Sequence, residues 1–100
     1  MKLGIFVNTD RHAEDLVGLT KAALSKKHKV IVFFMDDGVK LLTNPAVINL
    51  CYNPGVNMSY CDYTTQKMGV NKKRICEKMV CGSQFNNAMM NHEADRVIVL

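Results

Sequence analysis

The sequence lacks the segments and loops that mark several large classes of protein. No apolar run is long enough to cross a bilayer, and the residues before Asn8 hold too few apolar side chains for the core of a signal peptide. No Gly-x-Gly-x-x-Gly follows the first apolar run, and Gly-Lys-Ser/Thr occurs nowhere. We therefore expect a cytoplasmic protein that is not embedded in a membrane and has no phosphate-binding loop.

Cysteine and histidine pairs with metal-ligand spacing are also missing. The four cysteines stand at positions 51, 61, 76 and 81, with no Cys-x-x-Cys among them, and the three histidines show no ligand spacing with them. A metal site is therefore not expected. In a cytoplasmic chain all four cysteines should be reduced thiols rather than a disulfide framework. For Cys51 and Cys76 we expect packing or an idle surface thiol.

The composition that is present is that of one ordinary globular domain. One hundred residues, 48% hydrophobic and 22% charged, suffice for a single core, so we predict one domain over residues 1–100. Five cations lie between residues 67 and 78 with no aromatic residue among them, which argues against nucleic-acid binding. This basic segment is either a solvated connector or a docking patch for an acidic partner or an anionic sulfur species.

Hydrophobic periodicity predicts alternating strands and helices. Apolar runs predict five strands, at residues 2–7, 30–35, 56–61, 79–81 and 96–100. Helical spacing and capping residues predict helices at 11–27, at 39–50 with a break at Pro45, at 62–68 and at 84–91. Unbroken apolar strands, including a buried final strand, require a sheet covered on both faces. The fold class is therefore α/β with a mostly parallel sheet of about five strands.

Cys61 is the strongest chemical candidate. It stands where a predicted strand ends and a helix begins, and the N–H groups and positive dipole end of a helix N-terminus favour a thiolate. The alternative is a small buried thiol at the end of a strand. Asp62 opposes thiolate formation if its carboxylate points at the sulfur, or else caps the helix.

Two further candidates lie near the carboxyl ends of predicted strands, where reactive groups gather in parallel sheets. Cys81 is a candidate second thiol, with a core residue at a strand end as the alternative. His12 is a candidate thiol activator if its strand neighbours that of Cys61, because an imidazolium favours a nearby thiolate. Capping and solvent exposure are the alternative for His12.

In the order and spacing of these features the chain resembles the DsrE/DsrF-like family, which includes the TusBCD sulfur-relay subunits. The matching stretches are short and spread over the chain: Lys2 to Leu24, Val30 to Val39, Cys61 followed by Met68-Gly69-Val70, Gly82, and Glu93 to Val99. The resemblance implies a flavodoxin-like, three-layer α/β/α domain. It also implies assembly into a trimer or hexamer, either homomeric or heteromeric.

The resemblance further implies a chemistry. In sulfur-trafficking members a cysteine carries sulfane sulfur as a persulfide, and Cys61 matches that position. Sulfur donor and acceptor proteins, such as TusA-like or DsrC-like carriers, are the implied partners, without metal, organic cofactor, nucleic acid or membrane. Asp62 departs from the small apolar residues usual after that cysteine. The alternatives are a non-catalytic assembly subunit and, from the fold class, a module that binds a flavin or nucleotide in the strand-end crevice.

Overall fold

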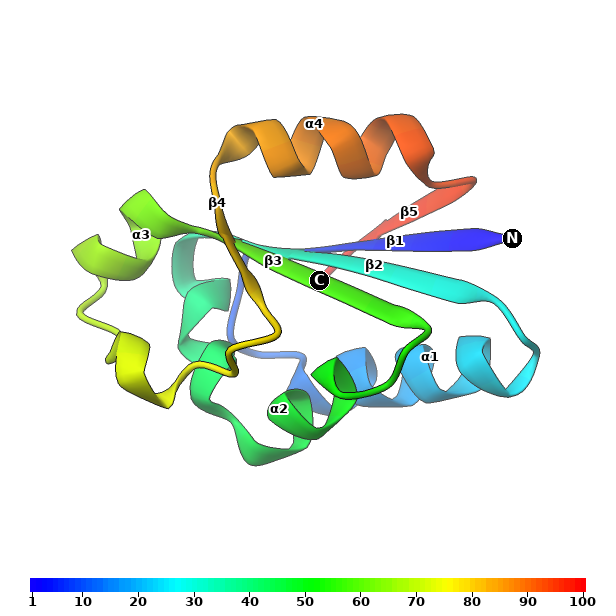
Figure 1. Cartoon of the computed structure of the whole chain (residues 1–100), viewed down its shortest axis with the longest axis horizontal. Coiled ribbons are helices and arrows are strands. Elements are labelled where there is room, and N and C mark those ends of the chain that lie inside the picture. Colours follow the sequence, from blue (N-terminus) through cyan, green and yellow to red (C-terminus); the bar gives the residue numbers. More distant parts are fainter.

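A five-stranded parallel sheet forms the centre of the computed structural model, which describes residues 1–100 (Figure 1). The strands are β1 (Lys2–Val7), β2 (Lys29–Phe34), β3 (Val56–Cys61), β4 (Val80–Gly82) and β5 (Arg96–Val99). Their order across the sheet is β4-β3-β2-β1-β5, and every neighbouring pair is parallel. All five strands lie within one residue of the predicted positions. The α/β class and the parallel sheet are thus confirmed.

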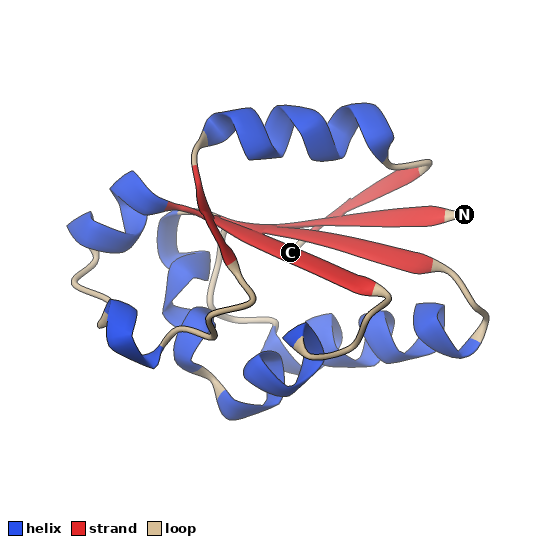
Figure 2. Cartoon of the chain, in the orientation of Figure 1, coloured by secondary structure: helices blue, strands red, loops and turns tan.

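Helices cover both faces of the sheet and make the three layers visible in Figure 2. The α-helices are α1 (Ala13–Ser25), α2 (Pro45–Cys51), α3 (Asp62–Lys67) and α4 (Gln84–Glu93), and the 3-10 helices are η1 (Asp36–Thr43) and η2 (Lys72–Arg74). Helix α4 lies alone on one face, while α1 and α2 lie on the other. The predicted break at Pro45 is confirmed: Pro45 starts α2, and Asn44 caps it by accepting from Ala46 N at 2.9 Å.

The core is divided by the sheet into a large and a small cluster. Seventeen buried residues from the sheet, α1, α2, η1 and the connector before β4 form the large cluster, to which β2 contributes Val30, Val32 and Phe34. The intervening Phe33 of β2 joins the small cluster with Met90 of α4. Alternate residues of β2 therefore fill different layers, which explains why its sequence is apolar without interruption.

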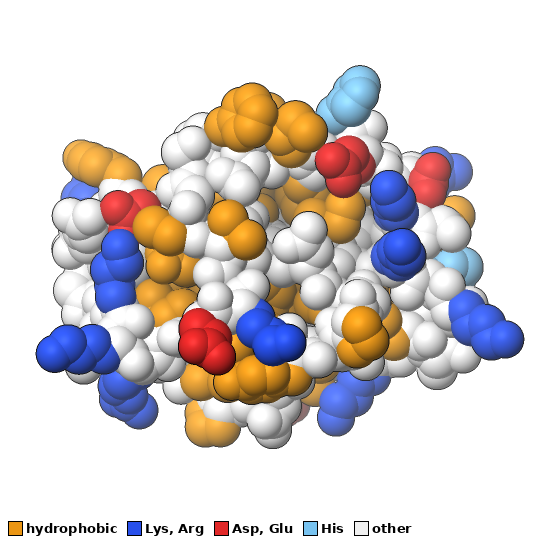
Figure 3. All heavy atoms as spheres, viewed as in Figure 1, with side chains coloured by type: hydrophobic (Ala, Val, Ile, Leu, Met, Phe, Trp, Pro, Cys, Tyr) orange, Lys and Arg blue, Asp and Glu red, His pale blue; other side chains and the backbone are white.

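Strand β5 is more exposed than its apolar sequence predicts. It lies at the sheet edge and pairs only with β1, and Val97 and Val99 are 38% and 62% exposed. The prediction of a buried final strand was wrong because an edge strand has one neighbour, and α4 packs mainly over β1, β2 and β3. Figure 3 shows further hydrophobic side chains over α4, where Phe85 and Met89 are exposed.

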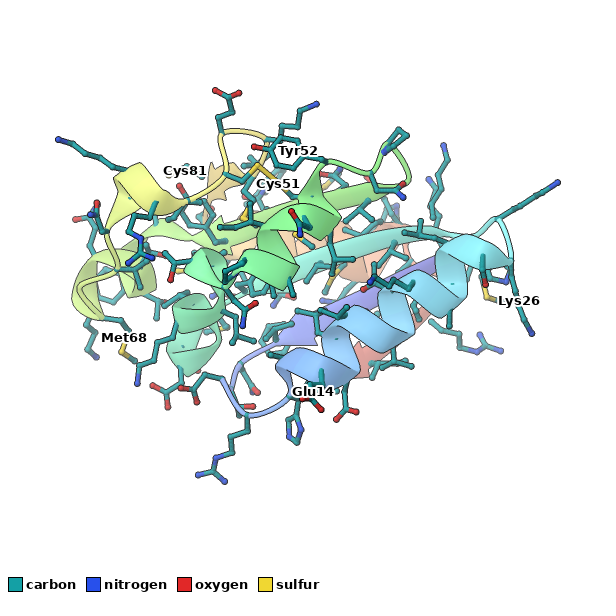
Figure 4. The ribbon with its side chains drawn as sticks, turned by 90° about the horizontal axis from the view of Figure 1, so that it is seen from below. Glu14, Lys26, Cys51, Tyr52, Met68 and Cys81 are labelled. Atoms are coloured by element: carbon teal, nitrogen blue, oxygen red, sulfur yellow. A yellow bond between two sulfur atoms is a disulfide. The ribbon has the colours of Figure 1, made fainter.

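The prediction of four free thiols was also wrong. A disulfide joins Cys51, at the end of α2, to Cys76, in the connector before β4 (Figure 4). Both residues are buried in the large cluster, and Lys78 of the connector also lies over the ring of Tyr52, 5.8 Å from its centroid. The connector and α2 cover the same face of the sheet, so residues 25 positions apart in the chain meet there.

Candidate functional site

Cys61 lies where the sequence predicts it, as the last residue of β3 and the residue that precedes α3. Its carbonyl accepts a hydrogen bond from Thr65 Oγ1 at 2.9 Å, which ties the junction together. The side chain is 6% exposed and packs in the small cluster with Phe33 and Met90. Helix α3 has only six residues, so few peptide dipoles align at its N-terminus and the dipole argument for Cys61 is weaker than the sequence suggested.

Cys81 is the second free thiol, and it lies in a different environment. It occupies the middle of the short strand β4 and is exposed rather than part of the core. Its Sγ lies 3.7 Å from Nζ of Lys72, which η2 presents from the basic connector. The thiol therefore has a cation beside it and an open approach from solvent.

The two free thiols point to opposite faces of the sheet. In the β3–β4 register Cys61 pairs with Gly82, and Tyr60 pairs with Cys81. Paired residues of adjacent strands share a face, and consecutive residues alternate between faces. Cys61 therefore faces α4 with Met90, whereas Cys81 faces the opposite layer with Tyr60. Sulfur cannot pass directly from one thiol to the other through the sheet.

Asp62 binds a lysine instead of capping its own helix. Its Oδ1 lies 2.6 Å from Lys72 Nζ, and its Oδ2 accepts from Gln66 Nε2 at 2.8 Å. The hydrogen bond from Lys72 lowers the pKa of Asp62, and the same bond raises the pKa of Lys72. The negative charge that the sequence places beside Cys61 is thus compensated by a residue ten positions away.

Tyr60 is a member of this cluster that the sequence analysis missed. The residue is 5% exposed, and its burial, together with a hydrogen bond to Cys81, raises its pKa to about 12. Tyr60, Asp62, Lys72 and Cys81 thus form a group of four titratable side chains at one corner of the sheet. The alternation of side chains along β3 predicts that Tyr60 and Cys61 point to opposite faces of the sheet. That Tyr60 lies beside Cys81 depends on the pairing of β3 with β4, which the sequence alone does not reveal.

His12 lies away from both free thiols. Its Nδ1 is 3.4 Å from Asp15 Oδ2 in the first turn of α1, and its side chain is 46% exposed. The role of thiol activator required β1 and β3 to be neighbours, and β2 lies between them. The structure therefore joins Cys81 to Lys72 and Asp62, and leaves His12 and Cys61 apart from that group.

Metal ligands and thiol-lined cavities are not found. No three His, Cys, Asp or Glu side chains gather as a metal-binding set, and no helix is long and apolar enough to cross a bilayer. An open apolar cavity of about 310 Å³ lies between α1 and α2, and no cysteine lines it or the three other cavities. Cys61 and Cys81 are the two free thiols at the carboxyl edge of the sheet.

Comparison with known proteins gives one family and one fold. The sequence profile of the DsrE/DsrF-like family matches residues 1–100. The crystal structure of the YchN protein from E. coli superposes with a TM-score of 0.73 at 14% sequence identity, over 99% of this chain and 97% of that chain. No curated protein sequence matches. At this identity the structural similarity establishes a shared fold.

Proposed function

Because the chain belongs to the DsrE/DsrF-like family, we propose that it carries sulfane sulfur as a persulfide on Cys61 and passes it to a thiol of a partner protein. The family is consistent with sulfur relay. The observation that supports the proposal is the location of the free thiols: two of the four cysteines form a disulfide, and the other two lie at the carboxyl edge of the sheet. Reactive groups gather at this edge in parallel sheets.

The transfer is a pair of thiol exchange steps. The Cys61 thiolate attacks the terminal sulfur of a donor persulfide; an S–S bond forms to Cys61 and the donor leaves as a thiolate. An acceptor thiolate then attacks the terminal sulfur of the Cys61 persulfide, and Cys61 leaves as a thiolate. Each step breaks one S–S bond and forms another, so neither needs an external oxidant or reductant. We propose a cytoplasmic setting, in which acceptor thiols are reduced; the buried Cys51–Cys76 disulfide is then an exception to the reduced state of cytoplasmic cysteines.

The surroundings of Cys61 place a condition on this transfer. Phe33 and Met90 pack against the sulfur, and Cys61 is 6% exposed. A partner thiol reaches the sulfur only when α4, which brings Met90 over it, moves away from the sheet. Docking of the partner protein near α4 and α3 is the natural cause of such a movement in this proposal.

The same burial favours a second candidate, a non-catalytic assembly subunit. A thiol packed between Phe33 and Met90 is a normal core residue. Four exposed apolar side chains on α4 and β5 offer a surface for association: Phe85, Met89, Val97 and Val99. Under either candidate we propose that the chain works as an oligomer.

Intact-mass spectrometry after incubation with polysulfide separates the two candidates. Under the carrier proposal, the mass of the parent protein should rise by single sulfur atoms, and a reductant should remove them. Cys61→Ser should lack the part of this mass increase that Cys61 contributes. Peptide mapping of the alkylated persulfide assigns the sulfur to Cys61 or Cys81, and Cys81→Ser is the matched control. If Cys61 stays unmodified in native protein both with polysulfide and with a persulfidated donor protein, and reacts with alkylating agents only after denaturation, the assembly-subunit candidate replaces the carrier.

A further inference from the structure

The cluster around Cys81 provides two hydrogen-bond donors for one exposed sulfur. The ammonium of Lys72 lies 3.7 Å from Cys81 Sγ. The Cα of Tyr60 pairs with that of Cys81 across β3 and β4, which places the tyrosine side chain beside Cys81 on the same face of the sheet. A tyrosine hydroxyl is protonated at neutral pH and can donate a hydrogen bond. Lys72 and Tyr60 can thus both donate to a sulfur anion at this position, whereas the carboxylate of Asp62 accepts a hydrogen bond from the neutral Cys81 thiol.

We propose that Cys81, with Lys72 and Tyr60 as its donors, is a second sulfur-loading site that accepts sulfane sulfur from small anionic persulfides. The site lies on the face of the sheet opposite Cys61 and is independent of it. This inference rests on the proposed sulfur-carrier function, and adds a donor class that needs no protein docking. A small donor reaches Cys81 from solvent, whereas Cys61 is covered by α4.

Charge around the site selects the donor class. Lys72 is followed by Lys73 and Arg74 in η2, and no acidic residue belongs to that helix. The nearest carboxylate, Asp62, is already paired with Lys72 at 2.6 Å. A persulfide that carries carboxylates, such as glutathione persulfide, is therefore attracted to this corner of the sheet.

The loading step balances without a further reagent. The Cys81 thiolate attacks the terminal sulfur of a persulfide R–S–SH, and a new S–S bond forms to Cys81. The S–S bond of the donor breaks, and its electron pair leaves on R–S⁻. The terminal sulfur keeps its hydrogen, so the product is Cys81–S–SH and the total charge is unchanged.

Asp62 limits the site because it competes for Lys72. The ammonium is shared between the carboxylate at 2.6 Å and the thiol at 3.7 Å, and the carboxylate holds it more closely. Removal of the Asp62 charge frees Lys72 for Cys81 and removes a negative charge that disfavours the thiolate. Asp62→Asn and Lys72→Met are thus expected to change Cys81 reactivity in opposite directions.

The test loads the full chain with glutathione persulfide and follows each thiol by alkylation and peptide mapping over time. In the parent protein we expect Cys81 to load before Cys61. Cys81 should also load in Cys61→Ser, and the peptide that contains position 81 should carry no sulfur in Cys81→Ser. Lys72→Met should slow loading of Cys81 about two- to fivefold, which is the range for one exposed charge pair. Lys72→Arg should restore the rate, and Asp62→Asn should raise it. Lys26→Met, which removes a lysine at the other end of the molecule (Figure 4), is the control with no expected change. The effect of Lys72→Met should shrink with an esterified, uncharged persulfide.

The outcomes distinguish this inference from the proposed function. Loading of Cys61 with none at Cys81 overturns the inference and leaves the Cys61 carrier intact. Loading of Cys81 with none at Cys61, even with a protein donor, supports the inference and overturns the Cys61 assignment. No loading at either thiol, with glutathione persulfide or with a protein donor, overturns both. A Cys81 rate that is equal in parent and Lys72→Met removes Lys72 from the site, provided that circular dichroism shows both proteins folded.

Discussion

Tyr60 becomes a weaker acid on folding. Its burial and its hydrogen bond to Cys81 raise the pKa from 10.0 to about 12. The folded protein therefore holds the Tyr60 proton to a higher pH than the unfolded chain does. The stability that protonated Tyr60 provides is complete below pH 10 and is lost as the pH rises toward about 12.

Tyr60→Phe tests this pH dependence. The parent should lose stability between pH 10 and about 12, and Tyr60→Phe should lose less over the same interval because its side chain cannot ionise. Urea unfolding at a series of pH values measures both. Tyr63→Phe, at an exposed position on α3, is the control and should follow the parent. Equal slopes in the parent and Tyr60→Phe would show that Tyr60 is not the group responsible.

The Asp62–Lys72 pair makes a second prediction at the level of side chains. Lys72→Met should raise the pKa of Asp62 from its lowered value toward 3.8, because the hydrogen bond from Lys72 is the largest cause of the shift. In the parent, the stabilisation from this pair is present above pH 3.8 and is lost as the pH falls through the folded pKa. Carboxyl-carbon NMR titration measures the change. Lys73→Met should leave the Asp62 titration unchanged.

At the level of elements, the disulfide and two glycine positions affect how stably the helices and connecting segments pack against the sheet. Cys51–Cys76 fastens the end of α2 to the connector that carries Lys72. The loop between the two cysteines contains β3, α3 and η2, so the disulfide restricts the unfolded chain over the region that bears Cys61 and Lys72.

The double variant Cys51→Ser/Cys76→Ser should lower the free energy of unfolding by about 3 kcal/mol, the usual value for closing a loop of this size. Urea unfolding of oxidised parent, reduced parent and the variant measures the difference. Reduced parent should unfold close to the variant, since the two share an open loop. Superposition of oxidised and reduced curves would mean that the disulfide does not stabilise the fold.

Gly38 of η1 and Gly18 of α1 form a matched pair for alanine substitution. A Cβ at Gly38 would collide with the backbone carbonyl of Val7, where η1 passes close to the end of β1. Gly38→Ala should therefore cost about 1–3 kcal/mol. A Cβ at Gly18 meets no atom within 4 Å, so Gly18→Ala should gain about 0.5–1 kcal/mol through helix propensity. Thermal unfolding of both variants checks the opposite signs.

At the scale of the whole molecule, the position of β5 at the sheet edge leaves an apolar surface next to α4. Val97 and Val99 are partly to largely exposed, and their register partners Gly4 and Phe6 place them on the α4 face. An exposed edge strand and exposed apolar side chains favour association with another copy of the chain. Strand β5 lies at the opposite end of the sheet order from β4, which carries Cys81.

Sedimentation velocity tests the proposed assembly. The parent should sediment as an oligomer, and Phe85→Ser on α4 should shift it toward a monomer because it removes an exposed aromatic side chain from this surface. Tyr63→Ser removes a comparably exposed aromatic from α3 and should leave the oligomer unchanged. A monomeric parent at micromolar concentration would contradict the prediction.

The sequence by itself determined the elements, the fold class and the strand-to-helix junction at Cys61. These follow from local physics: unbroken apolar runs, helical spacing and the restriction at Pro45 act within a few residues. Only the tertiary structure decided which residues meet. Strand order placed β2 between His12 and Cys61, left β5 at the edge, and set Cys61 and Cys81 on opposite faces. The Cys51–Cys76 disulfide and the Asp62–Lys72 pair likewise depend on how the connector packs, and such contacts between residues distant in sequence leave no local pattern to detect.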